Sequence, residues 1–308
     1  MGYGGALMWT AIARNLKEKY PDKAIIFIYK KSLRSFIKNK TSNDFIIYSE
    51  NHDISYIYNK FVWFFKKRFF QTNDYIVIDM ENSEYLYWIN SSKDRIAFKN
   101  TGKHAIQIAC DCFNISNPIL KPQISLTETE RRNAQFLIDK YNLNKKKYIC
   151  IEPHSKKGFT PNKEWFWDNW KGLTKKLNTY IAESNLSCDI VQLGVANQSI
   201  LDNVVDLTGQ TTFREIAYIL ENSLFFMGYM GGLVHLAKSM GKQSIVLVSA
   251  FEPLNLTSYP DDINFYTDIE CKNCGLKIPC PNDRECMRKI KVDDVFDAAK
   301  ALLTKSIN

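Results

Sequence analysis

The sequence predicts an α/β protein of two domains, each built on a parallel sheet covered by helices. Short apolar, β-branched segments recur along the chain and are typical of buried parallel strands, as at residues 24–29, 75–80 and 244–248. Amphipathic segments that fit helices lie between them. This alternation runs twice, on either side of the polar and basic segment 142–147. We therefore expect domains at residues 1–146 and 147–308, with a cleft between them.

The composition narrows the class of protein. The chain has 308 residues, a net charge of +8 and 45% hydrophobic residues, which suit folded domains of ordinary size. It shows no apolar run of about 20 residues and no secretory start, so we expect a cytoplasmic protein without a membrane span. The positive charge is concentrated in the first half and favours anionic partners, although a solvated lysine-rich surface has the same composition.

The first domain opens unusually. Gly2, Gly4 and Gly5 lead into a helical pattern over residues 6–19, and such a glycine loop normally follows a strand. No strand precedes it here, so we expect the first strand to be missing from this sequence. Strands are then predicted at 24–29, 45–48 and 75–80. Helices are predicted at 102–113 and from Thr127, where a capping box begins, to about residue 141.

The second domain repeats the alternation more clearly. Strands are predicted at residues 148–152, 188–193, 204–207, 224–227 and 244–248. Helices are predicted at residues 164–178, 213–221, 233–240 and 292–303, and the second of these follows a capping box at Thr212 and Glu215.

A glycine-rich stretch between the predicted strand 224–227 and the helix after it is the main functional signal. Gly228, Gly231 and Gly232 come within five positions, and His235 follows about one turn into the helix. Backbone N–H groups freed at a helix N-terminus suit an anion, most often a phosphate, and an imidazole there can bind a phosphate oxygen. The alternatives are an ordinary turn and a histidine that is held by the backbone.

The loop at residues 153–163 follows the first strand of the second domain. Ser155 and Lys163 supply a hydroxyl and a cation there, beside a helix start, at the sheet edge where α/β proteins bind ligands. The two loops sit at corresponding strand ends and are expected to face one site. A solvated basic loop is the alternative.

Four cysteines lie within sixteen residues near the C-terminus: Cys271, Cys274, Cys280 and Cys286. Four thiolates suit a tetrahedral structural metal such as zinc or iron. Two disulfides and free thiols are the alternatives.

Two further features have weaker meanings. Asp79 at the end of the strand 75–80, with Glu81 beyond it, is the first choice for a general base, and a surface carboxylate is the alternative. Residues 61–70 (FVWFFKKRFF) mix aromatic side chains with three cations. They fit contact with an anionic membrane or a core helix with a charged edge.

Together these motifs resemble glycosyltransferase family 9, the heptosyltransferase-like group. The resemblance rests on GYMGGLVHLAKSMG, the cysteine cluster and CMRKIKVDDVFDAAKAL in the second half. It also rests on PHSKKGFTPNKEWFWDNWKGL, GYGGALMWTAIARNLKEKYP and YIVIDMENSEY.

The resemblance implies the GT-B fold, two Rossmann-like domains with an acceptor bound to the first and a nucleotide-sugar donor to the second. It implies inverting transfer of a heptose or related sugar from ADP-heptose or another nucleotide-diphosphate sugar to a lipopolysaccharide or other surface glycan. No catalytic metal is implied. A non-enzymatic, basic nucleic-acid binder is a further alternative, but the α/β patterning argues against it, so we expect no nucleic-acid partner. Lys163 would contact the donor phosphates with Ser155 beside it, and Gly231, Gly232 and His235 would form the diphosphate cradle.

The sequence departs from the family pattern at two positions. Gly5 stands where the family usually has an aspartate base, and Met230 stands where it has an acid before the paired small residues. The base would then come from elsewhere, or the protein is a catalytically impaired homologue. An epimerase of the same fold, acting on a nucleotide sugar without an acceptor, is the other alternative.

Overall fold

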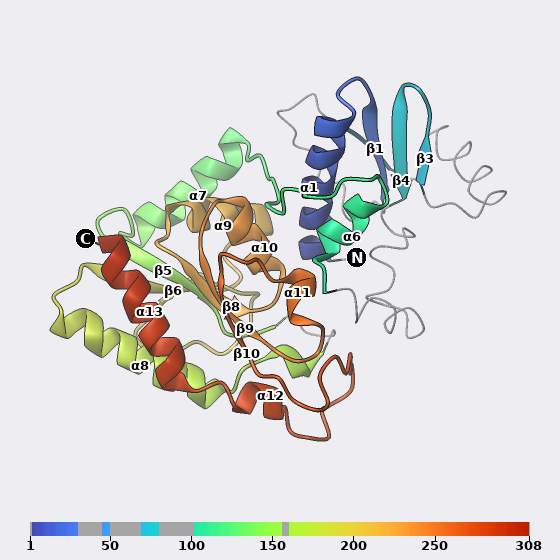
Figure 1. The fold of residues 1–308 in the computed structure, drawn as a ribbon. Coiled ribbons are helices and arrows are strands. Elements are labelled where there is room, and N and C mark those ends of the chain that lie inside the picture. The colour runs from blue at the N-terminus through green and yellow to red at the C-terminus, as the bar shows by residue number, and fades with distance from the viewer. Residues whose placement is uncertain (1, 30–44, 50–68, 80–101, 156–159, 308) are drawn as a thin grey trace. The chain divides into compact units, whose positions relative to one another are not determined.

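The computed structural model describes residues 2–29, 45–49, 69–79, 102–155 and 160–307 (Figure 1). The chain divides into two compact units, Met1–Ser125 and Leu126–Asn308. The division falls before helix α7 (Glu128–Lys140), whereas the predicted domains meet after residue 146. The reason is that α7 packs on α9 (Phe213–Asn222), and Leu143 in the supposed linker is buried. The segment 142–147 is thus part of the second unit.

The first unit contains a four-stranded sheet whose strands run in the order β2-β1-β4-β3. The strands are β1 (Ala24–Tyr29), β2 (Phe45–Ser49), β3 (Phe69–Gln71) and β4 (Tyr75–Asp79). β1 pairs in parallel with β2 and β4, as predicted, while β3 pairs antiparallel with β4 and was not expected. Helix α1 (Tyr3–Lys19) packs on β1 and on α6 (Ala105–Asp111).

Helix α1 differs from the prediction at its start. The residues of the predicted glycine loop belong to the helix instead: Gly2 is the N-cap, and Gly4 and Gly5 lie in the first helical turn. Alanine, leucine, methionine and tryptophan side chains that follow are buried, and their packing outweighs the weak helix propensity of glycine. Asn15 in this helix binds both the N–H and the carbonyl of Ile119, at 2.8 and 2.9 Å, so it holds the returning chain.

The second unit is a doubly wound α/β domain. Its strands are β5 (Lys147–Glu152), β6 (Cys188–Gln192), β7 (Val205–Asp206), β8 (Phe226–Tyr229), β9 (Ser244–Val248) and β10 (Ile263–Tyr266). Its other helices are η2 (Pro161–Lys163), α8 (Trp167–Glu183), α10 (Gly232–Ser239), α11 (Leu254–Thr257), α12 (Glu285–Arg288) and α13 (Val292–Ile307). Every strand pair in this sheet is parallel, which confirms the predicted sheet type.

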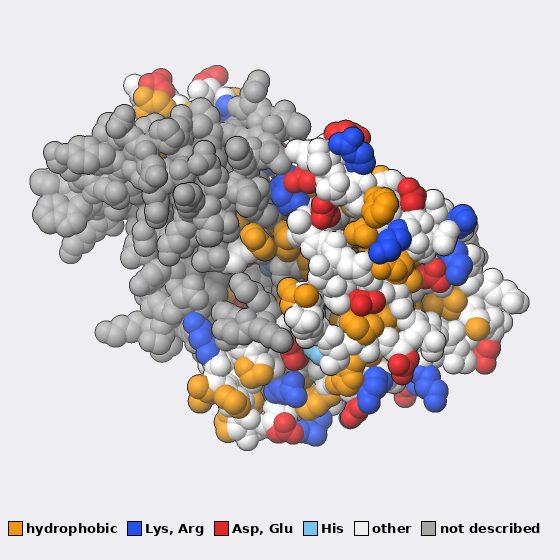
Figure 2. All heavy atoms as spheres, turned by 180° about the vertical axis from the view of Figure 1, so that it is seen from behind, with side chains coloured by type: hydrophobic (Ala, Val, Ile, Leu, Met, Phe, Trp, Pro, Cys, Tyr) orange, Lys and Arg blue, Asp and Glu red, His pale blue; other side chains and the backbone are white. Residues whose placement is uncertain are grey.

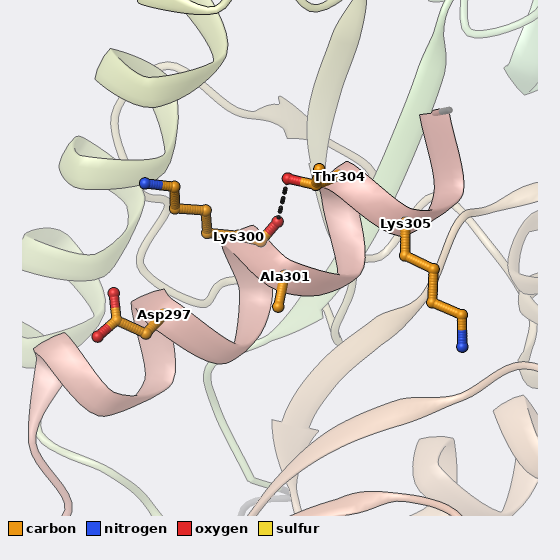
Figure 3. Close-up of a pocket in the computed structure, with 5 residues that line it drawn as sticks. All are labelled: Asp297, Lys300, Ala301, Thr304 and Lys305. Carbon is orange, nitrogen blue, oxygen red and sulfur yellow. Dashed lines mark hydrogen bonds between the residues drawn. The ribbon is translucent and has the colours of Figure 1, made fainter.

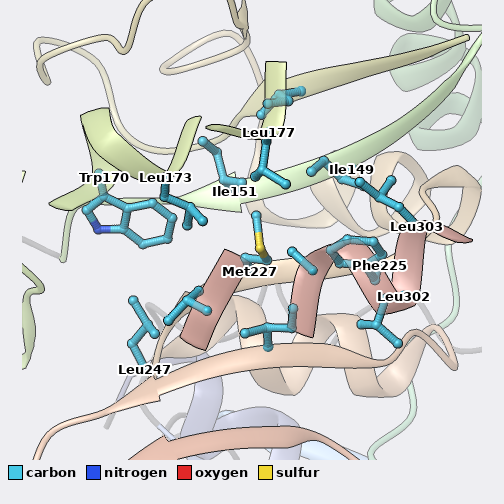
Figure 4. Close-up of a cluster of buried hydrophobic side chains, with 14 of the residues drawn as sticks. Ile149, Ile151, Trp170, Leu173, Leu177, Phe225, Met227, Leu247, Leu302 and Leu303 are labelled. Carbon is cyan, nitrogen blue, oxygen red and sulfur yellow. The ribbon is translucent and has the colours of Figure 1, made fainter. Parts of the chain in front are cut away.

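The core of the second unit lies between the sheet and helices α8 and α13 (Figure 4). Apolar side chains of β5, β8 and β9 alternate toward this face and meet the apolar stripes of the two helices. The labelled core residues are Ile149, Ile151, Trp170, Leu173, Leu177, Phe225, Met227, Leu247, Leu302 and Leu303. Helices α9 and α10 cover the other face (Figure 1), so the sheet is buried on both sides and only its strand ends are open to a ligand.

Local signals fix several helix starts. Both predicted capping boxes are present: Thr127 with Glu130 begins α7, and Thr212 with Glu215 begins α9. The predicted helix at 164–178 begins later, at Trp167, because residues 161–163 form a 3₁₀ turn that Thr160 caps. This turn positions Lys163.

The aromatic and basic segment 61–70 falls mostly outside the described residues; only Phe69 and Phe70 are described, as part of β3. In the part of the chain that the structure describes, no helix has the length and apolar character needed to cross a membrane.

Candidate functional site

The sheet of the second unit has one topological switch point. Its strand order is β10-β9-β8-β5-β6-β7, so the chain builds outward from β5 in one direction and then from β8 in the other. Parallel α/β sheets bind ligands outside the carboxyl ends of the strands at such a point. The two loops selected from the sequence follow β5 and β8, the two strands that flank it. The topology therefore brings both loops to one edge.

The glycine stretch forms a strand end, a short connection and a helix start. Gly228 belongs to β8, Gly231 is the extended N-cap of α10, and Gly232 is its first residue. Among the described residues no side chain caps this helix, so the N–H groups of its first turn are open to an anion. A Cβ on Gly231 would lie 2.6 Å from Cε2 of Tyr229, so glycine is required for the ring and the helix start to lie so close.

His235 lies one turn into α10 and is only 5% exposed. Its Nδ1 is 2.7 Å from Oη of Tyr259, a fully buried side chain. Burial and, to a smaller extent, the nearby charge of Lys163 together lower the pKa of His235 to about 4. The imidazole is therefore neutral at neutral pH and acts through hydrogen bonds rather than as a cation.

Lys163 is the cation of the site. Its ammonium pairs with Oε1 of Glu252 at 2.9 Å, and both side chains are nearly buried. The same ammonium lies 4.9 Å from the ring centre of Phe251, and Thr257 also donates to Oε1 of Glu252. Since its charge acts on His235, the structure brings these two predicted donor ligands together.

Ser155 is placed differently from the prediction that it assists Lys163. Its hydroxyl donates to Oε1 of Glu164 at 2.8 Å, and its backbone N–H donates to the same oxygen at 2.7 Å. The side chain is buried and closes the loop after β5. Residues 156–159, with two further lysines of the predicted basic loop, lie outside the described residues.

Glu152 is a site residue that sequence reasoning missed. It ends β5 and pairs in register with Gly228 of β8, so it lies at the switch point. Its Oε2 is buried and has no hydrogen-bond partner among the described residues, and burial raises its pKa well above the ordinary value. The signal in the sequence was a single acid closing an otherwise apolar strand. A carboxyl whose pKa is raised by burial in this way is typical of functional sites.

The four cysteines are free thiols, and Cys271 is exposed. Burial raises the pKa of Cys286, and Cys274 and Cys280 lie close enough to raise it further. Yet among the described residues no three histidine, cysteine, aspartate or glutamate side chains are arranged to hold a metal. Among the described residues the predicted metal site is therefore not formed as a ligand set, although Cys274 and Cys280 lie near Cys286.

The predicted bases are less well defined. Asp79 is the last residue of β4 in the first unit, as expected, but its side chain is not among those described. Glu81 lies outside the described residues altogether.

Two surface features do not coincide with this site. A hollow of about 450 Å³ is lined by Asp297, Lys300, Ala301, Thr304 and Lys305 of α13 (Figure 3). None of these belongs to the loops at the strand ends. On the face seen in Figure 2, the Lys and Arg side chains of the described residues are interspersed with Asp and Glu and do not form one basic patch.

Solved structures similar to this chain share its fold. One is the glycosyltransferase family 9 protein of Veillonella parvula, with 16% identity, 99% and 95% of the two chains covered and a TM-score of 0.69. Another is the ADP-heptose lipopolysaccharide heptosyltransferase II of E. coli, with 12% identity, 98% and 96% coverage and a TM-score of 0.56. No curated protein matches the chain.

A third similar structure is the iron-containing dodecameric glycosyltransferase TibC of enterotoxigenic E. coli, with 14% identity, 100% and 75% coverage and a TM-score of 0.61. TibC has also been solved in complex with ADP-D-beta-D-heptose, and that structure gives a TM-score of 0.55.

The family comparison goes beyond the fold. The model of glycosyltransferase family 9 (heptosyltransferase) matches residues 67–284, which include the strand ends, both loops and three of the four cysteines. The chain therefore belongs to glycosyltransferase family 9 and is a glycosyltransferase of the GT-B fold.

Proposed function

We propose that this glycosyltransferase moves a heptose or related sugar from a nucleotide-diphosphate donor to a lipopolysaccharide or other surface-glycan acceptor, with inversion. The observation that supports the donor half is the placement of Lys163, His235 and the uncapped start of α10 at the β5/β8 switch point, an arrangement that suits an anion. The complex of TibC with ADP-D-beta-D-heptose supports this donor class.

The donor diphosphate is bound by groups that each suit an anion. The first-turn N–H groups of α10 donate to phosphate oxygens, and the helix dipole favours their charge. Lys163 moves from Glu252 to the phosphates or shares its ammonium between them. His235 is neutral and donates one hydrogen bond, so Lys163 supplies the full positive charge. We expect no catalytic metal.

Transfer follows from this placement. The bond between the anomeric carbon and the diphosphate oxygen breaks, and its electron pair stays on the nucleotide. Lys163 and the α10 N-terminus stabilise that developing charge. An acceptor hydroxyl oxygen forms the new bond from the opposite side of the sugar, and its proton passes to a carboxylate base. Asp79 and Glu81 are the proposed bases, since Gly5 carries no carboxylate.

The test of the donor site is binding of ADP, UDP and GDP to the purified protein, measured by calorimetry and thermal unfolding. We expect one of them to bind and to raise the melting temperature. Lys163→Ala should weaken binding about 10- to 100-fold, because a charge-assisted hydrogen bond is lost. Lys176→Ala is the matched control, because it removes only an exposed ion pair between Lys176 of α8 and Asp293 of α13.

Absence of binding by all three nucleotides, or equal binding by Lys163→Ala and Lys176→Ala, would refute the donor site. Incubation with ADP-heptose alone separates transfer from epimerisation, because an epimerase turns over without an acceptor. If the protein binds ADP-heptose but transfers no sugar to lipopolysaccharide precursors, the result favours the alternative of a catalytically impaired homologue.

We propose that the segment with the four cysteines, Cys271 to Cys286, binds a structural zinc or iron. The neighbouring thiols of Cys274, Cys280 and Cys286 and the iron-containing TibC support this proposal. Elemental analysis of the purified protein should find about one metal per chain. If Cys271→Ser/Cys274→Ser retains the same metal content, these residues are not its ligands.

We place the enzyme in the cytoplasm, in peripheral contact with the inner face of the plasma membrane through residues 61–70. Sedimentation with vesicles that contain anionic lipid, compared with neutral vesicles, tests this contact. Equal recovery with both would count against it.

A further inference from the structure

The cysteine segment, defined here as residues 271–288, has a second role that does not depend on a metal. It forms hydrogen bonds with residues next to each partner of the ion pair between Lys163 and Glu252. On one side it hydrogen-bonds the short segment that carries Lys163. On the other it hydrogen-bonds the backbone just before Glu252. Both sets of contacts lie within the second unit, in residues that the structure describes.

The contacts to the Lys163 side converge on Asn162, which is 5% exposed. Its Nδ2 donates to the carbonyls of Leu276 and Ile278 at 2.9 and 2.8 Å. Its Oδ1 accepts from the N–H of Cys280 at 3.1 Å. The side-chain amide therefore uses both of its ends on one stretch of the cysteine segment, and it is the immediate neighbour of Lys163.

Further bonds support the same junction. Thr160 donates to the carbonyl of Leu276 at 2.9 Å, and Arg284 donates to the carbonyl of Glu164 at 3.0 Å. The guanidinium groups of Arg284 and Arg288 also lie over the ring of Phe166, at 4.3 and 5.0 Å from its centre. The residues on both sides of Lys163 are thus tied to the cysteine segment.

The Glu252 side is tied in the same way. The N–H of Asn273 donates to the carbonyl of Ala250 at 2.7 Å, and the N–H of Gly275 donates to the carbonyl of Phe251 at 2.9 Å. Phe251 is also the ring against which the Lys163 ammonium lies. The cysteine segment is therefore hydrogen-bonded both to the neighbour of Lys163 and to the two residues that precede Glu252.

We propose that Asn162 is a positioning residue, which holds the cysteine segment against the Lys163 turn and so fixes the ammonium of Lys163 for the donor diphosphate. This proposal rests on the donor role of Lys163 proposed above. It assigns the cysteine segment a part in nucleotide binding, beyond any metal that its thiols hold.

The first readout needs no ligand. Brief labelling of lysines with acetic anhydride, followed by mass spectrometry, measures how accessible the Lys163 ammonium is. Asn162→Ala should raise the labelling rate of Lys163 about 3-fold or more, because the turn loses three hydrogen bonds and the buried ion pair loosens. Asn178→Ala, which removes one exposed bond to the carbonyl of Asn203, is the matched control and should leave that rate unchanged.

The second readout is ADP affinity in a double-mutant cycle. Asn162→Ala should weaken ADP binding about 5- to 10-fold in the parent protein, but less than about 2-fold in the Lys163→Ala background, because its effect acts through Lys163. Thr160→Val removes the bond from Thr160 to the carbonyl of Leu276, together with the cap that Thr160 gives to the N–H of Asn162. It replaces Asn162→Ala if that variant does not fold, and a change in the same direction is expected.

The outcomes separate this proposal from the proposed function. If Lys163 labelling rises in Asn162→Ala while the parent protein binds no nucleotide, the positioning role stands and the donor site fails. If the parent binds ADP through Lys163, but Asn162→Ala matches Asn178→Ala in labelling and affinity, the positioning role is wrong. An additive cycle with Lys163→Ala also overturns it, since Asn162 would then act by another route.

Discussion

Two ionisable side chains near the β5/β8 edge of the second unit, His235 and Glu152, have pKa values that burial moves away from their ordinary values. His235 is neutral at physiological pH because burial lowers its pKa to about 4. The carboxyl of Glu152 holds its proton more strongly than usual because burial raises its pKa. The imidazole of His235 therefore adds no full charge to the candidate anion site at physiological pH. The positive potential of the candidate anion site comes from Lys163 and the start of α10. Donor affinity should therefore depend strongly on Lys163 and little on pH near neutrality, where His235 is neutral.

A third buried group, Asp262, gives a stability prediction. It is 8% exposed, its Oδ1 accepts from the N–H of Ser244, and burial raises its pKa to about 7. Because this pKa lies above the unfolded value of about 3.9, ionisation of Asp262 costs stability as pH rises from about 4 to about 7. Asp262→Asn imitates the neutral form. It should match the parent near pH 4 and be more stable at pH 8, by about 1–4 kcal/mol.

Urea unfolding at pH 4, 6 and 8 measures this effect. Asp268→Asn is the matched control, because Asp268 is largely exposed and pairs with Lys272 at the surface. A gain for Asp262→Asn that is equal at pH 4 and pH 8 would contradict the assigned burial of its charge.

Residue types in the sequence identified part of the site. Lys163 and His235 were selected from loop position and are brought together in the structure. Ser155 was selected by the same reasoning, but its hydroxyl is used by Glu164, a partner nine positions away that no spacing rule indicates. Glu152 was missed because an acid at a strand end is ordinary until its lack of a partner is seen. The sequence thus indicated which residue types belong to the candidate site, but it did not reveal their hydrogen-bond partners.

At the scale of elements, the β8–α10 connection depends on a close approach of backbone and ring. A Cβ on Gly231 would lie 2.6–3.0 Å from three atoms of the Tyr229 side chain, so Gly231→Ala must displace the ring or the start of α10. We expect ADP affinity to fall about 10-fold or more, because the first-turn N–H groups move with the helix start. Calorimetry of the variant with ADP measures the change.

Gly172→Ala is the control for this element. A Cβ at Gly172 in α8 meets only methyl groups of Val292, at 3.7 and 3.9 Å, which are ordinary contacts. This variant should bind ADP like the parent and gain up to about 1 kcal/mol of stability from better helix propensity. If Gly231→Ala also binds ADP like the parent, the start of α10 does not hold the diphosphate.

Elements were predictable where a local signal was strong. The apolar runs gave β1 and β9 with their correct bounds, and the two capping boxes gave the starts of α7 and α9. The strands β3 and β10 and the one-turn helices α11 and α12 were missed. Each is only three or four residues long, and such elements depend on their neighbours more than on their own pattern. The shift at α8 has the same origin, since contacts of Asn162 and Thr160 fix the turn before it.

At the scale of the molecule, the alternation of strands and helices was enough to predict an α/β protein of two parts with a parallel sheet in the second. It could not predict the order of the strands in the sheet, because one series of strands and crossover helices is compatible with several strand orders. The order β10-β9-β8-β5-β6-β7 is what makes the loops after β5 and β8 neighbours. The division at Ser125 was also missed, because the polar segment after α7 resembles a linker in composition alone.

The central claim is that the β5/β8 edge binds the diphosphate of a nucleotide-sugar donor. A crystal structure of the protein with ADP tests it most directly. We predict the diphosphate within hydrogen-bonding distance of the backbone N–H groups at Gly231 and Gly232 and of the Lys163 ammonium, with the Lys163–Glu252 pair opened or shared. ADP bound elsewhere, or bound at this edge with its phosphates away from Lys163 and α10, would contradict the account.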